Sequence, residues 1–444
     1  MYCGSCLHDN TLARALRRLG VDVQLIPTYT PLRTDEEDIS GDRLFLGGIN
    51  VFLDQVCPLC RYLPSLVRRL LDRPGLIRWA MSRPRATSAR FLGALTVSML
   101  RGSHGRQRRE VNRLCDWLSH SLRPHLVLFS NILIAGCAPR LRRELGVPLL
   151  VCLQGDDAFV EALPEPYKAQ AVAEIRKLTA HIDGFLVHSR YYAEFMGSYF
   201  GIPGEKLALV PLGIDTAGFP PPPGDDEPAA GSAPRARHAA RTIGYLARLA
   251  PEKGLHVLVD AFLDLRRREG HGDVCLGIAG WLGAEHRAYA AAAFDKLRAA
   301  GLGHAFRYWG SVDRQGKLDF LRTIDILSVP TTYRDPKGLF VLEALAAGVP
   351  VVQPAHGAFP ELLGTLGGGR LVPPNDPIRL ADALEELLRD EPRRRLLGRQ
   401  GAQAVHARFH AQAMAQATWD ACQRFLKPPG GPAPGSLESR SGSR

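Results

Sequence analysis

Two carboxylates and a predicted helix start lie together in the stretch 330–363, which reads PTTYRDPKGLFVLEALAAGVPVVQPAHGAFPELL. Asp335 precedes the helix, and Glu343 lies about one turn inside it. The helix begins near Gly338 and Leu339, and the backbone N–H groups of such a first turn lack intrahelical partners, which favours phosphate binding. Carboxylates accept hydrogen bonds from sugar and ribose hydroxyl groups. The stretch therefore predicts a nucleotide-sugar site.

A second loop places two cations at the start of another predicted helix. Arg248 and Lys253 lie on either side of the turn in the segment 244–254, which reads GYLARLAPEKG. Two cations beside a helix N-terminus favour a diphosphate, and they would also stabilise the charge that develops on a departing diphosphate. A pair of surface cations is the alternative, because basic residues are abundant in this chain. The position directly after a predicted strand favours the functional interpretation.

Strands and helices must position these loops, and the hydrophobic pattern predicts both. Apolar runs alternate with amphipathic stretches, which is typical of parallel α/β sheets with ligand sites at the C-terminal ends of the strands. The predicted strands are residues 21–26, 44–53, 125–130, 147–154, 184–189, 207–214, 242–246, 274–279, 305–308, 324–329 and 349–353. The predicted helices are residues 7–19, 132–145, 166–178, 191–200, 378–389, 393–406 and 411–426, with others from about 254, 285, 316 and 339.

A break in composition separates two α/β units. Proline, glycine and alanine dominate the region before residue 241, which cannot form a hydrophobic core. The predicted bounds are 1–215 for the N-terminal domain, 216–240 for a linker or loop, 241–410 for the C-terminal domain, 411–426 for a helix that packs back on the N-terminal domain, and 427–444 for a disordered tail.

The predicted helix 7–19 has no strand before it, although a helix in a βαβ fold follows one. The first strand of the N-terminal domain is therefore missing from the pattern. We expect Met1 to be an internal methionine of a longer reading frame, and a domain that lacks its first strand is the alternative. Neither a signal peptide nor an apolar run of about 20 residues is visible, which predicts a cytoplasmic protein.

The nine cysteines are an odd number spread over both halves, which argues against a disulfide framework. Two pairs, Cys3/Cys6 and Cys57/Cys60, have CxxC spacing. The distance between the pairs does not fit a compact zinc ribbon, so we interpret them as reduced thiols and expect no metal.

The segment 61–109 holds twelve arginines and a single acid, Asp72, so its charge of 12 − 1 = +11 equals the net charge of the whole chain. Apolar residues alternate with these arginines, which favours a peripheral contact with an anionic membrane surface. A solvated arginine-rich surface is the alternative. We expect no nucleic-acid partner, because no motif of a known binding module accompanies the charge.

The motifs of the second half resemble the donor domain of family 4 glycosyltransferases. The resemblance rests on RLAPEKG at 248–254, DPKGLFVLEALAAGVPVV at 335–352 and GAFPE at 357–361, and it extends to VPLGID at 210–215 and GRLVPPND at 369–376. Members of this family have the GT-B architecture, in which two Rossmann-like domains face each other across a cleft. The N-terminal domain would then be the acceptor side and the C-terminal domain the nucleotide-sugar donor side.

The resemblance also implies a role for each donor-side residue. Arg248 and Lys253 would hold the diphosphate, Glu343 would bind the ribose hydroxyls, and Asp335 would bind the hydroxyls of the donor sugar. The backbone at the helix start would contact the donor as well. Members of the family transfer a hexose with retention at the anomeric carbon, and most need no metal.

Acceptor-side candidates follow from the same resemblance. The glycine-rich first loop of the family corresponds here to Gly4, and Asp9 lies in the helix that follows. The family histidine that follows a strand has no clear counterpart in this chain, and the corresponding stretch is VCLQGDD at 151–157. There Gln154 would orient a hydroxyl and Asp156 would accept a proton, with Asp157 beside it. A solvated loop is the alternative for these two aspartates.

These observations predict a retaining glycosyltransferase that moves a hexose from a nucleoside-diphosphate sugar, without a cofactor, to a glycan, lipid or small glycoside acceptor. The family usually carries Glu where Asp335 stands. This departure and the missing first strand make a catalytically impaired sugar-nucleotide-binding protein the alternative. A dinucleotide oxidoreductase ranks last, because no GxGxxG follows a predicted strand. His188 also follows a strand, and we assign it to packing or a neutral cleft contact.

Overall fold

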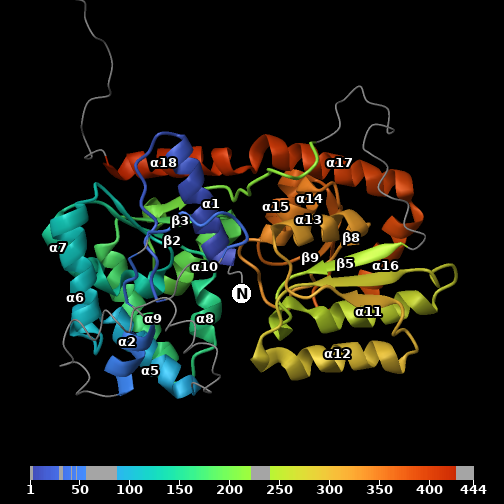
Figure 1. The fold of residues 1–444 in the computed structure, drawn as a ribbon, viewed down its shortest axis with the longest axis horizontal. Coiled ribbons are helices and arrows are strands. Elements are labelled where there is room, and N and C mark those ends of the chain that lie inside the picture. Colours follow the sequence, from blue (N-terminus) through green and yellow to red (C-terminus); the bar gives the residue numbers. More distant parts are fainter. Residues whose placement is uncertain are drawn as a thin grey trace, which may run out of the picture.

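The computed structural model describes residues 4–29, 34–41, 43–46, 48–56, 88–221 and 241–426. Two lobes face each other, and each is built on a parallel β-sheet with helices packed around it (Figure 1). Alternation of apolar strands with amphipathic helices produces this arrangement, because a parallel strand pair needs a crossover connection and the crossover helices bury both faces of the sheet.

The first lobe holds a four-stranded sheet in the order β1-β2-β3-β4. Its strands are β1 (Val127–Phe129), β2 (Leu149–Cys152), β3 (Gly184–Val187) and β4 (Leu207–Leu209). Every residue of β2 and β3 is buried, as expected for central strands covered on both faces. The helices of this lobe are α1 (Gly4–Arg18), α2 (Gly48–Val56), α5 (Ala89–Leu100), α6 (Arg108–Trp117), α7 (Ala138–Leu145), α8 (Asp156–Glu161), α9 (Tyr167–Leu178) and α10 (Arg190–Phe200).

The second lobe holds a six-stranded sheet in the order β10-β9-β8-β5-β6-β7. Its strands are β5 (Thr242–Leu246), β6 (Cys275–Ala279), β7 (Phe306–Tyr308), β8 (Ile326–Leu327), β9 (Val351–Pro354) and β10 (Gly369–Val372). Its helices are α11 (Leu255–Arg267), α12 (Arg287–Ala299), α13 (Arg314–Thr323), α14 (Leu339–Ala346), α15 (Phe359–Leu366), α16 (Pro377–Arg389) and α17 (Glu391–Arg408). Strand β5 lies between β6 and β8 in this sheet. The chain adds β6 on one side of β5 and later adds β8 on the other side, so the order of the strands reverses at β5. The loops after β5 and β8 therefore border a crevice of the kind that binds ligands.

Helix α18 (Ala411–Leu426) packs on the first lobe rather than on the second (Figure 1). Met414 and Ala415 of α18 share a hydrophobic cluster with Leu12 and Leu16 of α1. The approach of α18 is close, because a Cβ added at Gly213 would lie 2.7 Å from the Cβ of Met414. The last helix therefore joins the two lobes.

Two predicted strands near the N-terminus are wrong. Residues 48–56 form helix α2, and among the described residues 44–46 Phe45 makes an isolated bridge to Thr28. In the predicted strand 21–26, Leu25 makes one isolated bridge to Ser40. Short apolar runs fit a helix as well as a strand, so their period alone could not decide between them. Strand β10 was not predicted as a strand.

Several predictions lie outside the described residues: the CxxC cysteines Cys3, Cys57 and Cys60, most of the linker, the tail 427–444 and residues 61–87 of the basic segment. The described end of that segment forms α5 and begins α6. Among the helices that the structure describes, none is both long and apolar enough to cross a bilayer.

Candidate functional site

The two loops with the predicted donor residues touch each other at the crevice of the second lobe. Gly254, which precedes α11, has a φ of 72°, and a Cβ there would lie 1.8 Å from the carbonyl oxygen of Pro330. The backbone N–H of Thr332 donates to the carbonyl of Glu252 at 2.9 Å. Only glycine permits so close an approach in this conformation. The glycine of RLAPEKG therefore allows the loop after β5 to lie on the loop after β8.

Lys253 and Asp335, predicted from separate motifs, form an ion pair at this contact. The Lys253 Nζ lies 2.7 Å from Asp335 Oδ2, and the Tyr333 hydroxyl donates to the same oxygen at 2.8 Å. The Lys253 ammonium also lies over the Tyr333 ring, 4.7 Å from its centroid. Asp335 is only 4% exposed. The cation of one motif is thus held in place by the carboxylate of the other.

The second oxygen of Asp335 holds the start of α14. Asp335 Oδ1 accepts hydrogen bonds from the backbone N–H groups of Lys337 and Gly338, each at 3.0 Å. Gly338 has a φ of 71°, which directs the chain into the helix at Leu339. Burial alone would raise the pKa of Asp335, but Lys253 and these hydrogen bonds outweigh burial and lower the pKa to about 2. Asp335 is therefore charged at neutral pH.

Arg248 lies at the edge of the same site. Its guanidinium pairs with the Glu252 carboxylate, and 38% of its side chain is exposed. An exposed ion pair is weak, so Arg248 can exchange Glu252 for an anionic ligand at small cost. Two cations, one fixed and one exposed, thus come from the loop after β5.

Glu343 lies one turn into α14 and is buried beside a lysine that sequence analysis did not identify. Lys317 of α13 donates to Glu343 Oε1 at 2.6 Å and to Asp35 Oδ2 of the first lobe at 2.6 Å. Burial lowers the pKa of Lys317, but the two carboxylates outweigh burial and raise the pKa above its ordinary value. Glu343 is therefore oriented by a lysine that also joins the two lobes.

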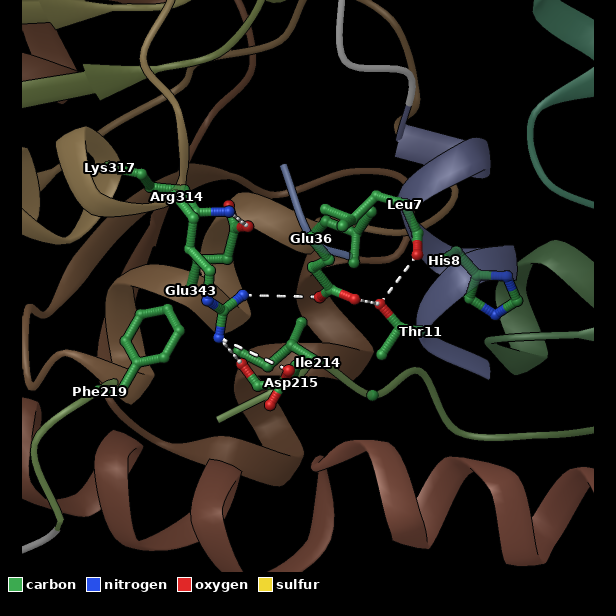
Figure 2. A pocket seen from close by; sticks show the side chains of 12 residues that line it. Leu7, His8, Thr11, Glu36, Ile214, Asp215, Phe219, Arg314, Lys317 and Glu343 are labelled. Atoms are coloured by element: carbon green, nitrogen blue, oxygen red, sulfur yellow. Dashed lines mark hydrogen bonds and ion pairs between the residues drawn. The ribbon is translucent and has the colours of Figure 1, made fainter. Parts of the chain in front are cut away.

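Lys317 and Glu343 border a hollow between the lobes (Figure 2). Figure 2 shows Glu36 of the first lobe between Thr11 and Arg314, with Asp215 on the other side of the Arg314 guanidinium. The lining residues come from both lobes and are Leu7, His8, Thr11, Glu36, Gly213, Ile214, Asp215, Phe219, Arg314, Lys317, Leu339 and Glu343. The predicted donor residues Leu339 and Glu343 thus face a hollow whose opposite wall belongs to the first lobe.

The acceptor-side candidates meet the donor loop through Lys337. The Lys337 ammonium donates to Gln154 Oε1 at 3.0 Å and to Ser5 Oγ at 3.1 Å. Gln154 in turn donates to Asp9 Oδ1 at 2.8 Å. A Cβ added at Gly4 would lie 3.4 Å from Leu339, so the start of α1 faces the start of α14. The structure therefore brings Gly4, Asp9 and Gln154 to the edge of the predicted donor site.

Asp156 and Asp157 have different surroundings. Asp156 is buried, and its two oxygens accept hydrogen bonds from the backbone N–H groups of Ile132 and Gln154, each at 3.0 Å. Burial raises the pKa of Asp156 to about 6, although these hydrogen bonds oppose the rise. Asp157 accepts a hydrogen bond from Tyr192 at 2.6 Å, and burial raises its pKa as well. This geometry favours a positioning role for Asp156, and proton transfer through it stays a prediction.

Comparison with known proteins identifies the family. The model of the glycosyl transferases group 1 matches residues 232–404, and that of the glycosyl transferase 4-like domain matches residues 10–213. A GDP-mannose-dependent α-(1-6)-phosphatidylinositol monomannoside mannosyltransferase of Mycobacterium tuberculosis is 30% identical over 292 residues, which are 64% of this chain and 71% of that protein. This chain belongs to the group 1 glycosyltransferases.

Two further relatives of this group 1 glycosyltransferase match over shorter parts of their length. The phosphatidyl-myo-inositol mannosyltransferase of Mycobacterium leprae is 36% identical over 37% of this chain and 42% of that protein. The D-inositol 3-phosphate glycosyltransferase of Xylanimonas cellulosilytica is 30% identical over 60% of this chain and 62% of that protein. The chain thus spans less than two thirds of the length of these two relatives.

Solved structures confirm the GT-B fold of this group 1 glycosyltransferase. The sucrose-phosphate synthase of Thermosynechococcus elongatus has a TM-score of 0.61 at 19% identity, covering 94% of this chain and 92% of that one. HepE of Anabaena, solved with UDP and glucose, has a TM-score of 0.60 at 15% identity, covering 90% of this chain and 100% of that one. The predicted pair of facing Rossmann-like domains is therefore correct.

Several residues at the site of this glycosyltransferase were not predicted from the sequence. Lys337 and Tyr333 lie inside the stretch that carried the prediction, and their charge and hydroxyl were visible signals. Lys317 and Asp35 gave no such signal, because 282 residues separate them along the chain. Glu361 accepts hydrogen bonds from the backbone N–H groups of Arg190 and Tyr191 at the start of α10.

Proposed function

We propose that this protein is a retaining glycosyltransferase that transfers a hexose from a nucleoside-diphosphate sugar to a glycan, lipid or small glycoside acceptor. The observation that carries the proposal is the 2.7 Å ion pair between Lys253 and Asp335, because it joins the cationic loop to the start of α14. Cations beside the start of a helix are features that bind a diphosphate.

The donor would be held at three places along its length. Arg248 and Lys253 bind the diphosphate and stabilise the charge that develops as the bond to the sugar breaks. Glu343 accepts hydrogen bonds from the ribose hydroxyls, since its carboxylate lines the hollow. The backbone of Gly338 and Leu339 contacts the donor at the helix start. These cations supply the positive charge that a metal supplies elsewhere, so the proposal requires no metal at the diphosphate.

The role of Asp335 towards the sugar requires an exchange of partners. Its oxygens already accept hydrogen bonds from Lys253, Tyr333 and two backbone N–H groups. A sugar hydroxyl can bind Asp335 only if it replaces one of these donors, and the Tyr333 hydroxyl is the neutral side chain among them. We propose that the sugar takes the place of Tyr333 while the ion pair with Lys253 stays.

Calorimetric titration of the purified chain with UDP, GDP and their hexose derivatives tests donor binding. Arg248→Ala, Lys253→Ala and Glu343→Ala should each weaken binding of the preferred donor about tenfold or more, or about 1.4 kcal/mol. Lys296→Ala removes an exposed lysine of α12 and should leave the affinity unchanged. Equal affinity in all four variants would contradict the proposed site.

The transfer reaction requires a separate assay with acceptors of each class. Two relatives are named for inositol-containing lipids and a third for D-inositol 3-phosphate, so the panel includes such compounds beside glycans and simple glycosides. The anomeric configuration of the product, read by NMR, distinguishes retention from inversion. Donor binding without transfer to any acceptor would favour the alternative of a catalytically impaired sugar-nucleotide-binding protein.

We also propose that residues 61–109 attach the protein to anionic lipid, because their charge is +11. Sedimentation with phosphatidylserine vesicles at low salt should retain the protein. Reversal of charge at Arg68, Arg69, Arg73 and Arg78 should release it. Equal retention of the reversed variant would refute the contact.

A further inference from the structure

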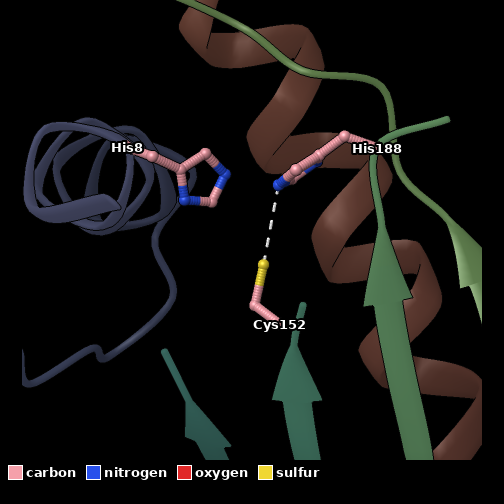
Figure 3. Close-up of side chains that lie close together, drawn as sticks. All are labelled: His8, Cys152 and His188. Carbon is pink, nitrogen blue, oxygen red and sulfur yellow. Dashed lines mark hydrogen bonds between the residues drawn. The ribbon is translucent and has the colours of Figure 1, made fainter. Parts of the chain in front are cut away.

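Three side chains without a role in the proposed transfer lie together at the C-terminal ends of strands β2 and β3 in the first sheet. His8 comes from α1, Cys152 ends β2, and His188 follows β3 directly (Figure 3). One ligand atom from each residue lies within 4.8 Å of the ligand atoms of the other two. The Cys152 Sγ and the His188 Nε2 are 3.6 Å apart, and the ring centroids of His8 and His188 are 4.7 Å apart.

One of the three ligand spacings is that of a tetrahedral zinc site. Zinc binds a thiolate at about 2.3 Å and an imidazole nitrogen at about 2.0 Å, which puts neighbouring ligand atoms about 3.3 to 3.6 Å apart at tetrahedral angles. The contact between Cys152 and His188 already has that length. A shift of the His8 side chain by about 1 Å, within the range of ordinary rotamer adjustment, would complete the three zinc ligands.

The other nitrogen of each histidine ring is already anchored. His188 Nδ1 lies 3.0 Å from the carbonyl oxygen of Val210, and His8 Nδ1 lies 2.9 Å from Asp9 Oδ1. Because a carbonyl and a carboxylate accept hydrogen bonds, each ring donates through Nδ1 and keeps a lone pair on Nε2. Metal-binding histidines are oriented in this way by an outer carboxylate or carbonyl.

One atom of the cluster lacks a partner. His8 Nε2 is buried and has no hydrogen-bond partner among the residues that the structure describes, and His8 is only 1% exposed. A buried polar atom without a partner costs about 1 to 3 kcal/mol. A metal ion between His8, Cys152 and His188 would remove this cost, and water would occupy the fourth tetrahedral position.

We propose that His8, Cys152 and His188 bind one zinc ion that fastens α1 to the ends of β2 and β3. Zinc binding displaces the thiol proton of Cys152, so the thiolate and the Asp9 carboxylate together balance the charge of the ion. The three residues are not among those proposed to hold the donor, so the zinc site does not depend on the proposed transfer, although His8 also lines the hollow between the lobes. It is linked to the cleft, because Asp9 also accepts a hydrogen bond from Gln154, which in turn accepts one from Lys337.

Metal analysis of the full chain, purified without chelator and without a metal-affinity tag, tests the site. Inductively coupled plasma mass spectrometry should find one zinc per chain, and competition with a chromophoric chelator gives the affinity. Cys152→Ala and His8→Gln should each lower zinc affinity about 100-fold or more. Cobalt substitution should give visible bands with a thiolate charge-transfer band that Cys152→Ala abolishes.

Controls separate this site from other thiols. Cys275→Ala removes a thiol of β6, in the other lobe, and should leave zinc content and affinity unchanged. The double variant Cys57→Ser/Cys60→Ser should keep the zinc as well. Far-ultraviolet circular dichroism establishes whether each variant is folded, and zinc should raise the thermal midpoint of the wild type but not that of Cys152→Ala.

The proposal is overturned if zinc content follows Cys57 and Cys60 rather than Cys152. It is also overturned if the purified chain neither contains nor binds zinc, or if folded Cys152→Ala and His8→Gln bind zinc as tightly as the wild type. The donor-binding assay is independent, so a failure of nucleotide binding leaves this test unaffected.

Discussion

Buried carboxylates in this protein differ in pKa because their partners differ. Asp335 and Asp156 are each 4% exposed, yet the pKa falls to about 2 at Asp335 and rises to about 6 at Asp156. Asp335 has the Lys253 ammonium at 2.7 Å, whereas Asp156 has backbone N–H groups and the neighbouring Asp157. A cation offsets the desolvation of a carboxylate, and two neutral hydrogen bonds do so only in part. Asp335 is thus fully charged at neutral pH, and Asp156 titrates close to it.

The raised pKa of Asp156 predicts a pH dependence of stability. Native Asp156 holds its proton to about pH 6 and unfolded Asp156 only to about pH 4, so the native state binds more protons between these values. Stability therefore falls as the pH rises through this window, by about 3 kcal/mol for this group. Urea unfolding from pH 4 to pH 7 should show this loss in the wild type.

The Asp156→Asn variant tests the assignment. It removes the titrating group, so the free energy of unfolding should decline less between pH 4 and pH 6 than in the wild type, whatever constant offset the amide adds. Parallel pH profiles of the two proteins would refute the raised pKa.

Among the secondary-structure elements, α14 depends on the glycines at its two ends. Gly338 before the helix and Gly348 after it have φ values of 71° and 69°. Their surroundings differ, because a Cβ at Gly338 would lie 3.2 Å from Leu362 and Phe359, whereas nothing lies within 4 Å of one at Gly348. Both positions require a left-handed backbone. Only Gly338 is closely packed and lies at the proposed donor site.

Alanine at each end of α14 separates these effects. Both Gly338→Ala and Gly348→Ala should lose about 1 kcal/mol of unfolding free energy from the left-handed backbone. Gly338→Ala should lose about 1 kcal/mol more from crowding and should weaken nucleotide binding, because it displaces the N–H groups of the helix start. Chemical denaturation and calorimetry measure the two quantities. A loss of nucleotide affinity in Gly348→Ala equal to that in Gly338→Ala would contradict a specific role for the helix start.

For the whole molecule, a buried lysine joins the lobes beside the hollow. Lys317 pairs with Asp35 of the first lobe and with Glu343 of the second. All three side chains are at most 10% exposed, so salt and water screen the pairs little. The orientation of Glu343 towards a donor therefore depends on the closure of the two lobes.

Removal of Lys317 should cost more than removal of an exposed lysine. Lys317→Ala leaves two buried carboxylates without their cation, which should lower the free energy of unfolding by about 3 to 5 kcal/mol. Lys296→Ala breaks an exposed pair with Asp260 and should cost less than about 1 kcal/mol. Denaturant unfolding of both variants gives the difference. Equal losses would mean that the Lys317 pairs are as solvated as the surface pair.

Sequence motifs and the periodicity of the apolar residues were enough to predict most of the fold. The helix predicted at 411–426 coincides with α18, because a long regular pattern has one interpretation, and the strand predicted at 242–246 coincides with β5. The region 21–53 was misread, because its short apolar runs satisfy more than one period. The loops that carry the proposed donor residues were also predictable, since each motif is continuous in sequence and lies at a loop between a strand and a helix.

The sequence by itself determined the two α/β units, the donor motifs and the resemblance to glycosyltransferases, because local periodicity and contiguous motifs encode them. Only the tertiary structure decided that Lys253 and Asp335 pair, that Lys317 joins Asp35 to Glu343, and that His8, Cys152 and His188 lie together. These contacts connect residues 26 to 282 positions apart. Such pairs leave no periodic signal in the chain, since they arise from the parallel order of the strands and the closure of one lobe on the other.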